Sequence, residues 1–469
     1  MSFFEYISIK HLDEYRPCES WHNTLMLFSQ TVPSMRHAAM ALALMHRNYR
    51  ALDRSPNNNR LHLPPYAIPD RDPLFHYNQA IQLLLDQDTG DSIETTAITL
   101  LVCYVFICFD HLARNYVQAM KHLRGGVELL RSIDRASLER NNTPSGLRAL
   151  ISQITRQIGR LDMQAVTFLV DWTPVDLQEM PLPRDISPIS VNAFHSLDQA
   201  ADHLQIIVAR VMWLRNMEQQ QPQGSTATTE SEVTPPSSPS SSQIVGSLLN
   251  QLETWSTLFS NMLLQQPPTP SPSPLTPLLH LHHTISYILL RTHAAPDGEM
   301  AFDNFFSQFQ QCLTWADEIT MAHEQTLTPE VGIIPVLYII GVKCRHPVLR
   351  REALRILRLR PMREAVWDSI ITARVVERVI DIEEGGGVEL GDNAKGIIAR
   401  EGRDPGPEGV PVWQRVEMVS WVHVVDGEDT TGERLDITYT VCGRDGACVE
   451  SVLLWCSVGR VGCPTSSGI

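Results

Sequence analysis

The sequence of 469 residues predicts an all-α protein, a bundle of antiparallel helical hairpins with a small β-hairpin near its C-terminal end. Two observations lead to this prediction. Apolar residues recur at helical spacing through most of the chain, and alternation with a period of two begins only at about residue 413. The most apolar stretch, residues 94–131, is typical of two helices joined by a tight turn. We therefore place this hairpin at the centre of the core.

The first helix of the central hairpin, residues 94–112, is apolar on nearly every side, which is typical of a helix buried all round. The second, residues 116–131, carries a single apolar stripe, and Asn115 stands where a side chain would cap it. Cys103 and Cys108 lie on different faces of the first helix. Because a free buried cysteine behaves as a small hydrophobic residue, we interpret both as core.

Further helices are expected on both sides of this hairpin, in two halves of one domain. The first half, residues 1–217, adds helical patterns at 21–52, 73–85, 145–170 and 190–217. The second half, residues 278–384, has them at 278–293, 300–321, 331–342, 347–359 and 361–384. A run of three glycines from Gly385 ends the last pattern.

Residues 218–277 interrupt the helical pattern with two insertions rich in Ser, Thr, Pro and Gln, which flank a helix at 244–264. Such segments bury too little apolar surface to offset the entropy of ordering, so we expect them to be disordered. The helix between them carries a stripe that must dock onto the core, formed by Leu248, Leu252, Trp255 and Phe259. The insertions therefore interrupt one domain rather than separate two.

After residue 384 the pattern changes. A flexible loop is expected over 385–412, a β-hairpin over 413–441, and an irregular tail over 442–469. The hairpin prediction depends on alternation in two runs, which a polar, Gly-containing turn separates.

The composition argues against some classes of function and indicates a cellular compartment. The formal net charge is −15, which argues against a chain that wraps nucleic acid, because phosphate binding needs clustered basic residues. Nine scattered cysteines suit a reducing compartment. We expect neither a signal peptide nor a membrane span, because the start lacks a basic n-region and uncharged apolar runs stay short.

No catalytic signature supports an enzyme. The sequence lacks a P-loop, a dinucleotide-binding glycine motif, a nucleophile elbow and a zincin motif, so we expect no catalytic residue and no cofactor. No metal site is expected either. The C-terminal cysteines Cys442, Cys448, Cys456 and Cys463 form no C-x-x-C pair, and His280, His282 and His283 are more simply explained as helix-surface histidines.

One basic cluster, residues 343–363, has two interpretations. Arg351, Arg355 and Arg358 share one face of a predicted helix and are candidates for contact with an acidic partner or a phosphate. Alternatively, this is a solvated face that pairs with the chain's own acids.

Several hydroxyl residues in the insertions precede proline: Thr234, Ser238, Thr269, Ser271 and Ser273. Phosphorylation at these candidate sites would add about −1.5 to −2 charges each and alter docking of the 244–264 helix. A plain spacer explains the same composition.

Several stretches in order resemble a known family. They are residues 33–38 (PSMRHA), 43–47 (ALMHR), 101–106 (LVCYVF), 115–130, 160–165 (RLDMQA), 343–353, 364–369 and 373–378. Together they resemble the fungal-specific transcription factor domain, the helical regulatory region of ascomycete regulators with a binuclear zinc cluster. The similarity covers roughly residues 28–413.

The resemblance implies a transcription regulator in the nucleus that contacts other regulators or coactivators and forms a homo- or heterodimer. It also implies pathway-specific control of secondary metabolism. A binuclear zinc cluster needs six thiolates in short pairs, whereas Cys18 stands alone until Cys103. We therefore expect DNA to be reached only indirectly. The alternatives are a helical metabolic enzyme and a zinc-cluster regulator truncated by its gene model.

Overall fold

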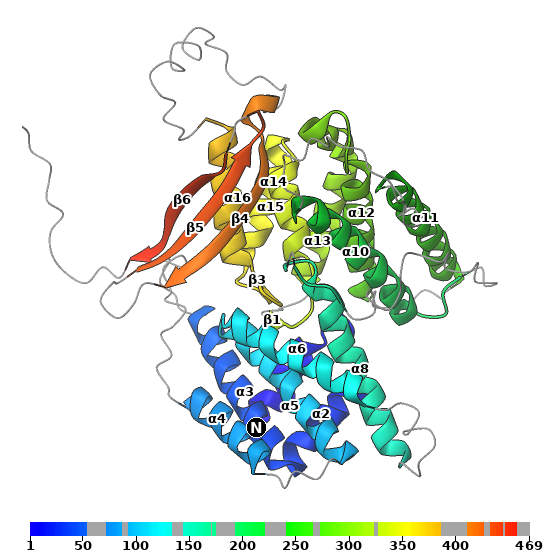
Figure 1. Ribbon diagram of the computed structural model, residues 1–469, viewed down its shortest axis with the longest axis vertical. Coiled ribbons are helices and arrows are strands. Elements are labelled where there is room, and N and C mark those ends of the chain that lie inside the picture. The colour runs from blue at the N-terminus through cyan, green and yellow to red at the C-terminus, as the bar shows by residue number, and fades with distance from the viewer. Residues whose placement is uncertain are drawn as a thin grey trace, which may run out of the picture. The chain divides into compact units, whose positions relative to one another are not determined.

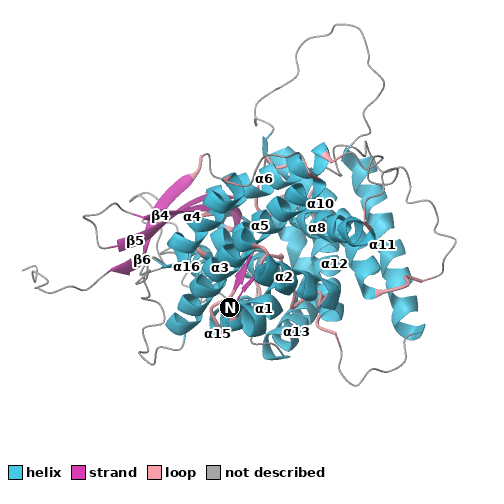
Figure 2. Cartoon of the chain, turned by 90° about the horizontal axis from the view of Figure 1, so that it is seen from below, coloured by secondary structure: helices cyan, strands magenta, loops and turns pink. Residues whose placement is uncertain are grey.

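The computed structural model describes residues 1–53, 72–86, 92–133, 144–169, 171–174, 193–220, 241–265, 273–322, 327–385, 410–425, 432–443 and 446–456. The chain forms two compact units. Unit 1 comprises Met1–Arg50 with Asp70–Ala373, and unit 2 comprises Ala51–Pro69 with Arg374–Ile469. The described residues are mostly helical, with small sheets, so the predicted fold class is confirmed (Figures 1 and 2).

The first half of unit 1 is a helical bundle (Figure 1). Its elements are the π-helix η1 (Phe4–Ser8), α1 (Ile9–Leu12), α2 (Glu19–Thr31), α3 (Pro33–Asp53), α4 (Asp72–Leu85), α5 (Ile93–Leu112), α6 (Tyr116–Ser132) and α8 (Ser145–Ala165). α5 and α6 are the predicted central hairpin, and both pack against α8.

α5 is the core helix of this half. Ser92 caps it by accepting a hydrogen bond from the Thr95 N–H at 3.1 Å. By length and composition α5 could cross a membrane, and the buried core helix of a globular protein has the same properties. In the structure most of its side chains from Leu100 to Leu112 are buried in the bundle. Gly126 lets α6 approach closely, since a Cβ there would lie 3.2 Å from the Cys103 sulfur.

The turn between α5 and α6 differs from the sequence prediction in one respect. Asn115 occupies the cap position of α6, but its side chain accepts no capping hydrogen bond. It instead donates to the Asp110 carboxylate at 3.3 Å, and its backbone N–H donates to the Asp110 carbonyl at 2.8 Å. Asp110 therefore closes the turn, with Arg114 in the left-handed region at φ 59°.

The second half of unit 1 is also helical. It comprises α10 (Leu197–Gln220), α11 (Ser241–Gln265), α12 (Leu275–Arg291), the 3-10 helix η2 (Gly298–Phe305), α13 (Phe306–Ala322), α14 (Ile334–Lys343), α15 (Pro347–Leu359) and the start of α16 (Ser369–Glu383). α11 buries its predicted stripe, and the Trp255 indole N–H donates to the Ala200 carbonyl at 2.8 Å. Residues 221–240 and 266–272, in the predicted insertions, lie outside the described residues.

A small sheet replaces the beginning of the helix predicted from residue 361. β1 (Leu327–Thr328) pairs in parallel with β2 (Arg363–Glu364), which pairs antiparallel with β3 (Trp367–Asp368). α16 begins only at Ser369, because the Asp368 carboxylate accepts the N–H groups of Ile370 at 3.0 Å and Ile371 at 3.1 Å. The aspartate is an N-terminal cap, which fixes the start of the helix after it.

Unit 2 contains the remainder of α16 and a three-stranded antiparallel sheet. After the 3-10 helix η3 (Val412–Gln414), the strands are β4 (Val416–Val425), β5 (Gly432–Val441) and β6 (Cys448–Cys456), in the order β4-β5-β6. The predicted hairpin is present, but the irregular tail expected from residue 442 is wrong over β6. That strand pairs along β5, and Glu450 accepts a hydrogen bond from the Tyr439 hydroxyl at 2.7 Å.

Candidate functional sites

A buried carboxylate organises the junction between the two halves of unit 1. Glu364, on β2, is fully buried and accepts the backbone N–H groups of Gly332, Ile333 and Ile334 at 2.8–3.1 Å. These are the unpaired N–H groups at the start of α14, where a negative charge also meets the positive end of the helix dipole. Burial raises the pKa of Glu364, and its hydrogen bonds oppose that rise.

Two further residues complete this cap. The Tyr15 hydroxyl donates to Glu364 at 2.6 Å, and burial next to this carboxylate raises the pKa of Tyr15. Gly332 leaves no room for a side chain, because a Cβ there would lie 2.4 Å from both Glu364 Oε1 and Tyr15 Cε2. We call Tyr15, Gly332 and Glu364 the Glu364 cap.

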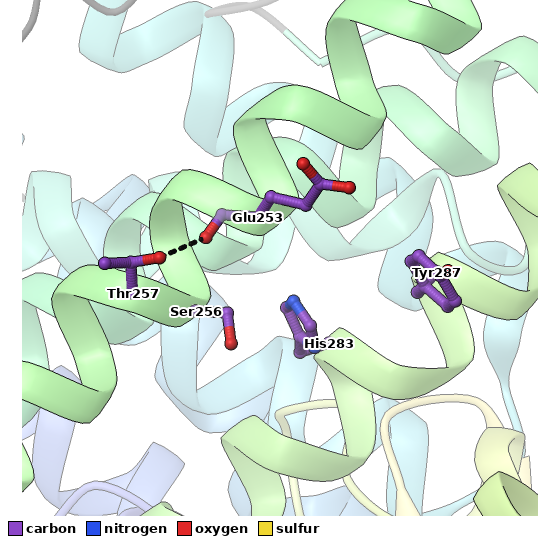
Figure 3. A pocket seen from close by; sticks show the side chains of 5 residues that line it. All are labelled: Glu253, Ser256, Thr257, His283 and Tyr287. Atoms are coloured by element: carbon purple, nitrogen blue, oxygen red, sulfur yellow. Dashed lines mark hydrogen bonds between the residues drawn. The ribbon is translucent and has the colours of Figure 1, made fainter.

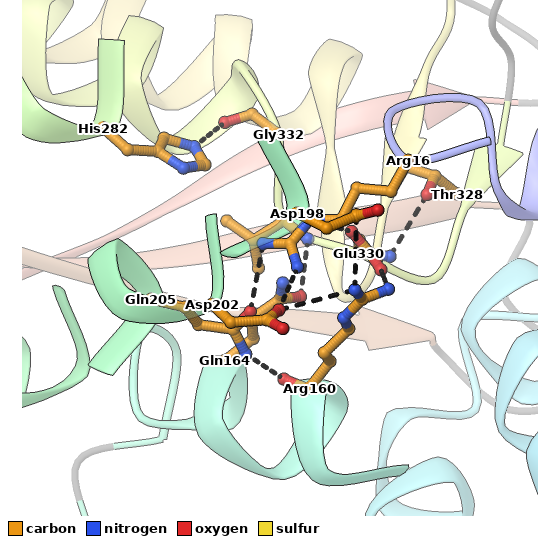
Figure 4. Close-up of polar contacts among 11 residues, drawn as sticks. Arg16, Arg160, Gln164, Asp198, Asp202, Gln205, His282, Thr328, Glu330 and Gly332 are labelled. Carbon is orange, nitrogen blue, oxygen red and sulfur yellow. Dashed lines mark hydrogen bonds and ion pairs between the residues drawn. The ribbon is translucent and has the colours of Figure 1, made fainter. Parts of the chain in front are cut away.

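A network of charges lies beside the cap (Figure 4). Arg16 binds the Asp202 carboxylate at 2.8 Å, and Arg160 approaches the same oxygen at 3.4 Å. Both arginines are also 3.8 Å from the buried Glu330, in the segment between β1 and α14. The network therefore joins α8, α10 and the segment after β1 to residues that follow α1.

A second buried ion cluster holds β3 to the α5–α6 turn. Asp368 lies 2.9 Å from the Arg114 guanidinium and 3.2 Å from that of Arg363. Arg363 also donates to the carbonyls of His111 and Leu112, the last turn of α5. Burial acts to raise the pKa of Asp368, but Arg114 and Arg363 outweigh it and lower the pKa to about 2. Asp368 therefore stays ionised.

A third polar cluster contains residue types that enzymes use. The Tyr77 hydroxyl donates to Asp110 at 3.1 Å and lies 2.7 Å from His122 Nε2, and burial raises the pKa of Asp110 to about 7. The Tyr77 ring also stacks on Phe106, with ring centroids 4.1 Å apart. These groups hold α4, α5 and α6 together. Packing accounts for them.

The predicted basic cluster separates into buried and exposed parts. Lys343 and Arg345 pair with Glu299 at 2.6 Å and 2.8 Å, and Arg350 is fully buried, donating to the Gly341 carbonyl. On the outer face of α15, Arg351 and Arg355 are exposed and Arg358 is half-buried.

The three predicted arginines thus share a face, and each has local contacts. Arg355 pairs with Glu352 and with Asp317 of α13, and Arg351 donates to the Pro347 carbonyl at 3.1 Å. This arrangement matches a solvated face that pairs with the chain's own acids, and its outer side stays accessible to a partner.

The histidines of α12 are packed rather than standing on its surface as expected. His282 contacts the Gly332 carbonyl at 2.9 Å, and His283 contacts the Leu252 carbonyl at 3.1 Å. His280 stacks on Trp315, with ring centroids 4.9 Å apart. No group of three or more potential metal ligands occurs among the described His, Cys, Asp and Glu residues.

A hollow of about 340 Å³ opens between α11 and α12 (Figure 3). Glu253, Ser256 and Thr257 line it from α11, and His283 and Tyr287 from α12. The sequence pattern did not indicate this hollow, because the three residues that line it from α11 are ordinary outer positions of an amphipathic helix.

Of the candidate phosphorylation sites, only Ser273 falls within the described residues; Thr234, Ser238, Thr269 and Ser271 lie outside them. Ser273 stands just before α12 and is half-buried. Its hydroxyl accepts the Leu275 N–H at 3.3 Å.

Comparison with known proteins finds a fungal relative. Over 153 residues, the chain is 26% identical to the aspercryptin biosynthesis cluster-specific transcription regulator of Emericella nidulans. The match covers 32% of this chain and 24% of the relative's length. No family model matches the chain. No solved structure matches it either.

Proposed function

We propose that this protein is a transcription regulator of a fungal biosynthetic pathway for a specialised metabolite, and not an enzyme. The observation that carries the proposal is the 153-residue similarity to a cluster-specific regulator. The helical fold and the motifs that resemble the fungal-specific transcription factor domain support it.

In this proposal the helical domain works through protein–protein contacts in the nucleus. Its partners are other transcription regulators or coactivators, or a second copy of the chain, and DNA is reached through them. The outer face of α15 is the proposed contact surface for an acidic partner. Arg351 and Arg355 project from it, and their charge suits the acidic segments of such partners.

A tethering assay tests the proposal. The chain is fused to a foreign DNA-binding domain in a filamentous fungus that carries a matching reporter gene. We expect the fusion to raise or lower reporter transcription, whereas the foreign domain alone leaves it unchanged. A fusion that is nuclear and stable but never changes the reporter would contradict the regulator function.

The α15 surface has its own test. The double charge reversal R351E/R355E should reduce the reporter effect and leave the fold intact, and E318Q, at an exposed position of α13, is the matched control. A mobility-shift assay separates the two ligand chemistries. If the intact protein shifts DNA and the double variant does not, the α15 surface binds phosphate. If the intact protein gives no shift, the acidic partner is the ligand that the proposal retains.

The proline-directed sites belong to the same proposal as a regulatory input. Phosphate at Ser273 would lie near the first turn of α12, where a negative charge interacts favourably with the helix dipole. Phosphopeptide mapping under inducing and non-inducing growth should find modified sites among Thr234, Ser238, Thr269, Ser271 and Ser273. Unmodified peptides under all conditions would remove this part.

A further inference from the structure

The hollow between α11 and α12 combines groups that no structural role fully uses. Glu253 is exposed, and among the described residues its carboxylate has no hydrogen-bond or ion-pair partner. Figure 3 shows the Glu253 side chain on the α11 side of the hollow, across from His283 and Tyr287 on α12. A carboxylate beside the face of a tyrosine ring attracts a ligand cation, because the carboxylate is negative and the ring face carries the negative part of the ring quadrupole.

His283 adds a hydrogen-bond acceptor. Its Nε2 lies 3.1 Å from the Leu252 carbonyl, which can only accept, so Nε2 carries the proton and Nδ1 keeps its lone pair. Burial lowers the pKa of His283, which favours this neutral form. The Trp255 indole stacks on the imidazole with ring centroids 5.3 Å apart and fixes its plane. The hollow thus has a positioned acceptor beside the carboxylate.

A positive group flanks the same tyrosine. Arg291, one turn after Tyr287 on α12, holds its guanidinium 5.2 Å from the centre of the Tyr287 ring, and its Nε donates to the Tyr287 hydroxyl at 3.1 Å. Within the described part of the chain, its two terminal nitrogens have no acceptor. Among the described residues Glu253 and Arg291 form no ion pair with each other, so both can bind groups of a ligand.

From this juxtaposition we infer that the hollow binds an α-amino acid with an aromatic side chain. The ligand ammonium lies at Glu253 and His283 Nδ1, its ring against Tyr287, and its carboxylate at Arg291, which adjoins Tyr287. The volume of about 340 Å³ is at the lower end for small-molecule sites, which suits a ligand of this size. The inference concerns binding by the chain itself and holds whether or not the chain regulates transcription.

Binding is tested on the purified full chain by isothermal titration calorimetry with three probes. Phenylalanine carries both charges, phenethylamine lacks the carboxylate, and 3-phenylpropionate lacks the ammonium. We expect phenylalanine to bind about tenfold more tightly than either partial probe, since each loses one charge-assisted contact. Quenching of Trp255 fluorescence gives a second readout, because this indole stacks on a wall of the hollow.

Two variants assign the contacts. E253Q should weaken phenylalanine and phenethylamine about tenfold and leave 3-phenylpropionate unchanged, and R291Q should weaken phenylalanine and 3-phenylpropionate only. E318Q, an exposed glutamate away from the hollow, should bind as the wild type does. All three positions are exposed, so the variants should keep the wild-type melting temperature. No saturable binding of phenylalanine, or equal binding by wild type, E253Q and R291Q, overturns the inference.

Discussion

Charged residues of the same types occur in two environments. One is the outer face of α15, and the other comprises the Glu364 cap and the ion cluster of Asp368. On α15, arginines meet acids in water, where an ion pair contributes little because solvent screens it. At β2 and β3, Glu364 and Asp368 are buried, and each is surrounded by donors that would be left unsatisfied without it. The charges on the outer face of α15 therefore contribute little to stability, whereas the buried carboxylates Glu364 and Asp368 hold elements of the fold together.

Four experiments test whether the buried and the exposed charges differ in this way, and the variant expected to lose the most stability comes first. The first is Gly332→Ala. Its Cβ would overlap Glu364 and Tyr15, both fully enclosed, and would cost about 3 to 6 kcal/mol from overpacking and disrupted charged hydrogen bonds. Urea denaturation measures the loss. Gly125→Ala is the control: its Cβ meets nothing within 4 Å, so it should stabilise α6 by about 1 kcal/mol. Equal stability of the two variants would mean that the cap is not tightly packed.

The second experiment removes the charge of the ion cluster. Asp368→Asn should destabilise unit 1 by about 3 kcal/mol at neutral pH, because Arg114 and Arg363 would then be buried without an anion. The asparagine oxygen still accepts from the start of α16, which keeps the loss near the lower end. An unfolding midpoint within error of the wild type would place these arginines in water.

The third experiment follows the same carboxylate with pH. The pKa of Asp368 falls from about 3.9 in the unfolded chain to about 2 in the fold, so its contribution to stability is fully present above about pH 5. That contribution is lost as the pH falls toward 2. The difference in stability between wild type and D368N should therefore be constant from pH 7 to 5 and shrink by about 2 kcal/mol at the acid end. A pH-independent difference would contradict the depressed pKa.

The fourth experiment addresses the exposed face. Arg355→Ala removes the ion pairs of Arg355 with Glu352 and Asp317. All three side chains are about two-fifths exposed, so the loss in the free energy of unfolding should stay below about 1 kcal/mol. Adding 0.5 M salt to the wild type should have a similarly small effect. A loss as large as that of D368N would erase the distinction between the two regions.

The central hairpin was predictable because α5 is apolar on all sides and α6 has one stripe, so the pattern itself specifies burial. The Glu364 cap was not predictable. A glutamate between Arg363 and Ala365 looks like a helix-surface acid, and nothing local indicates that Tyr15 and Gly332 surround it. One signal was available at Asp368-Ser369, since an aspartate before a helical pattern predicts a cap, and it would have placed the start of α16 correctly.

β6 was missed for a related reason. Its residues 448–456 include Glu450 on the side that meets Tyr439, so apolar alternation is broken where the strand makes its ion pair with Arg378. Polar groups that are paired across elements interrupt the pattern on which sequence reasoning depends. The hollow between α11 and α12 was not predicted for the opposite reason, because the residues that line it from α11 fit the ordinary outer face of an amphipathic helix.

The hydrogen bond between Tyr15 and Glu364 spans 349 positions of the chain. During synthesis α14 emerges with its first N–H groups open, and Glu364 reaches them about twenty residues later than the helix itself is complete. The hydrogen bond of Tyr15 to Glu364 can therefore form only after almost the whole of unit 1 has left the ribosome. The contact that closes unit 1 is therefore a long-range one, and we expect this unit to finish folding only after residue 364 has left the ribosome.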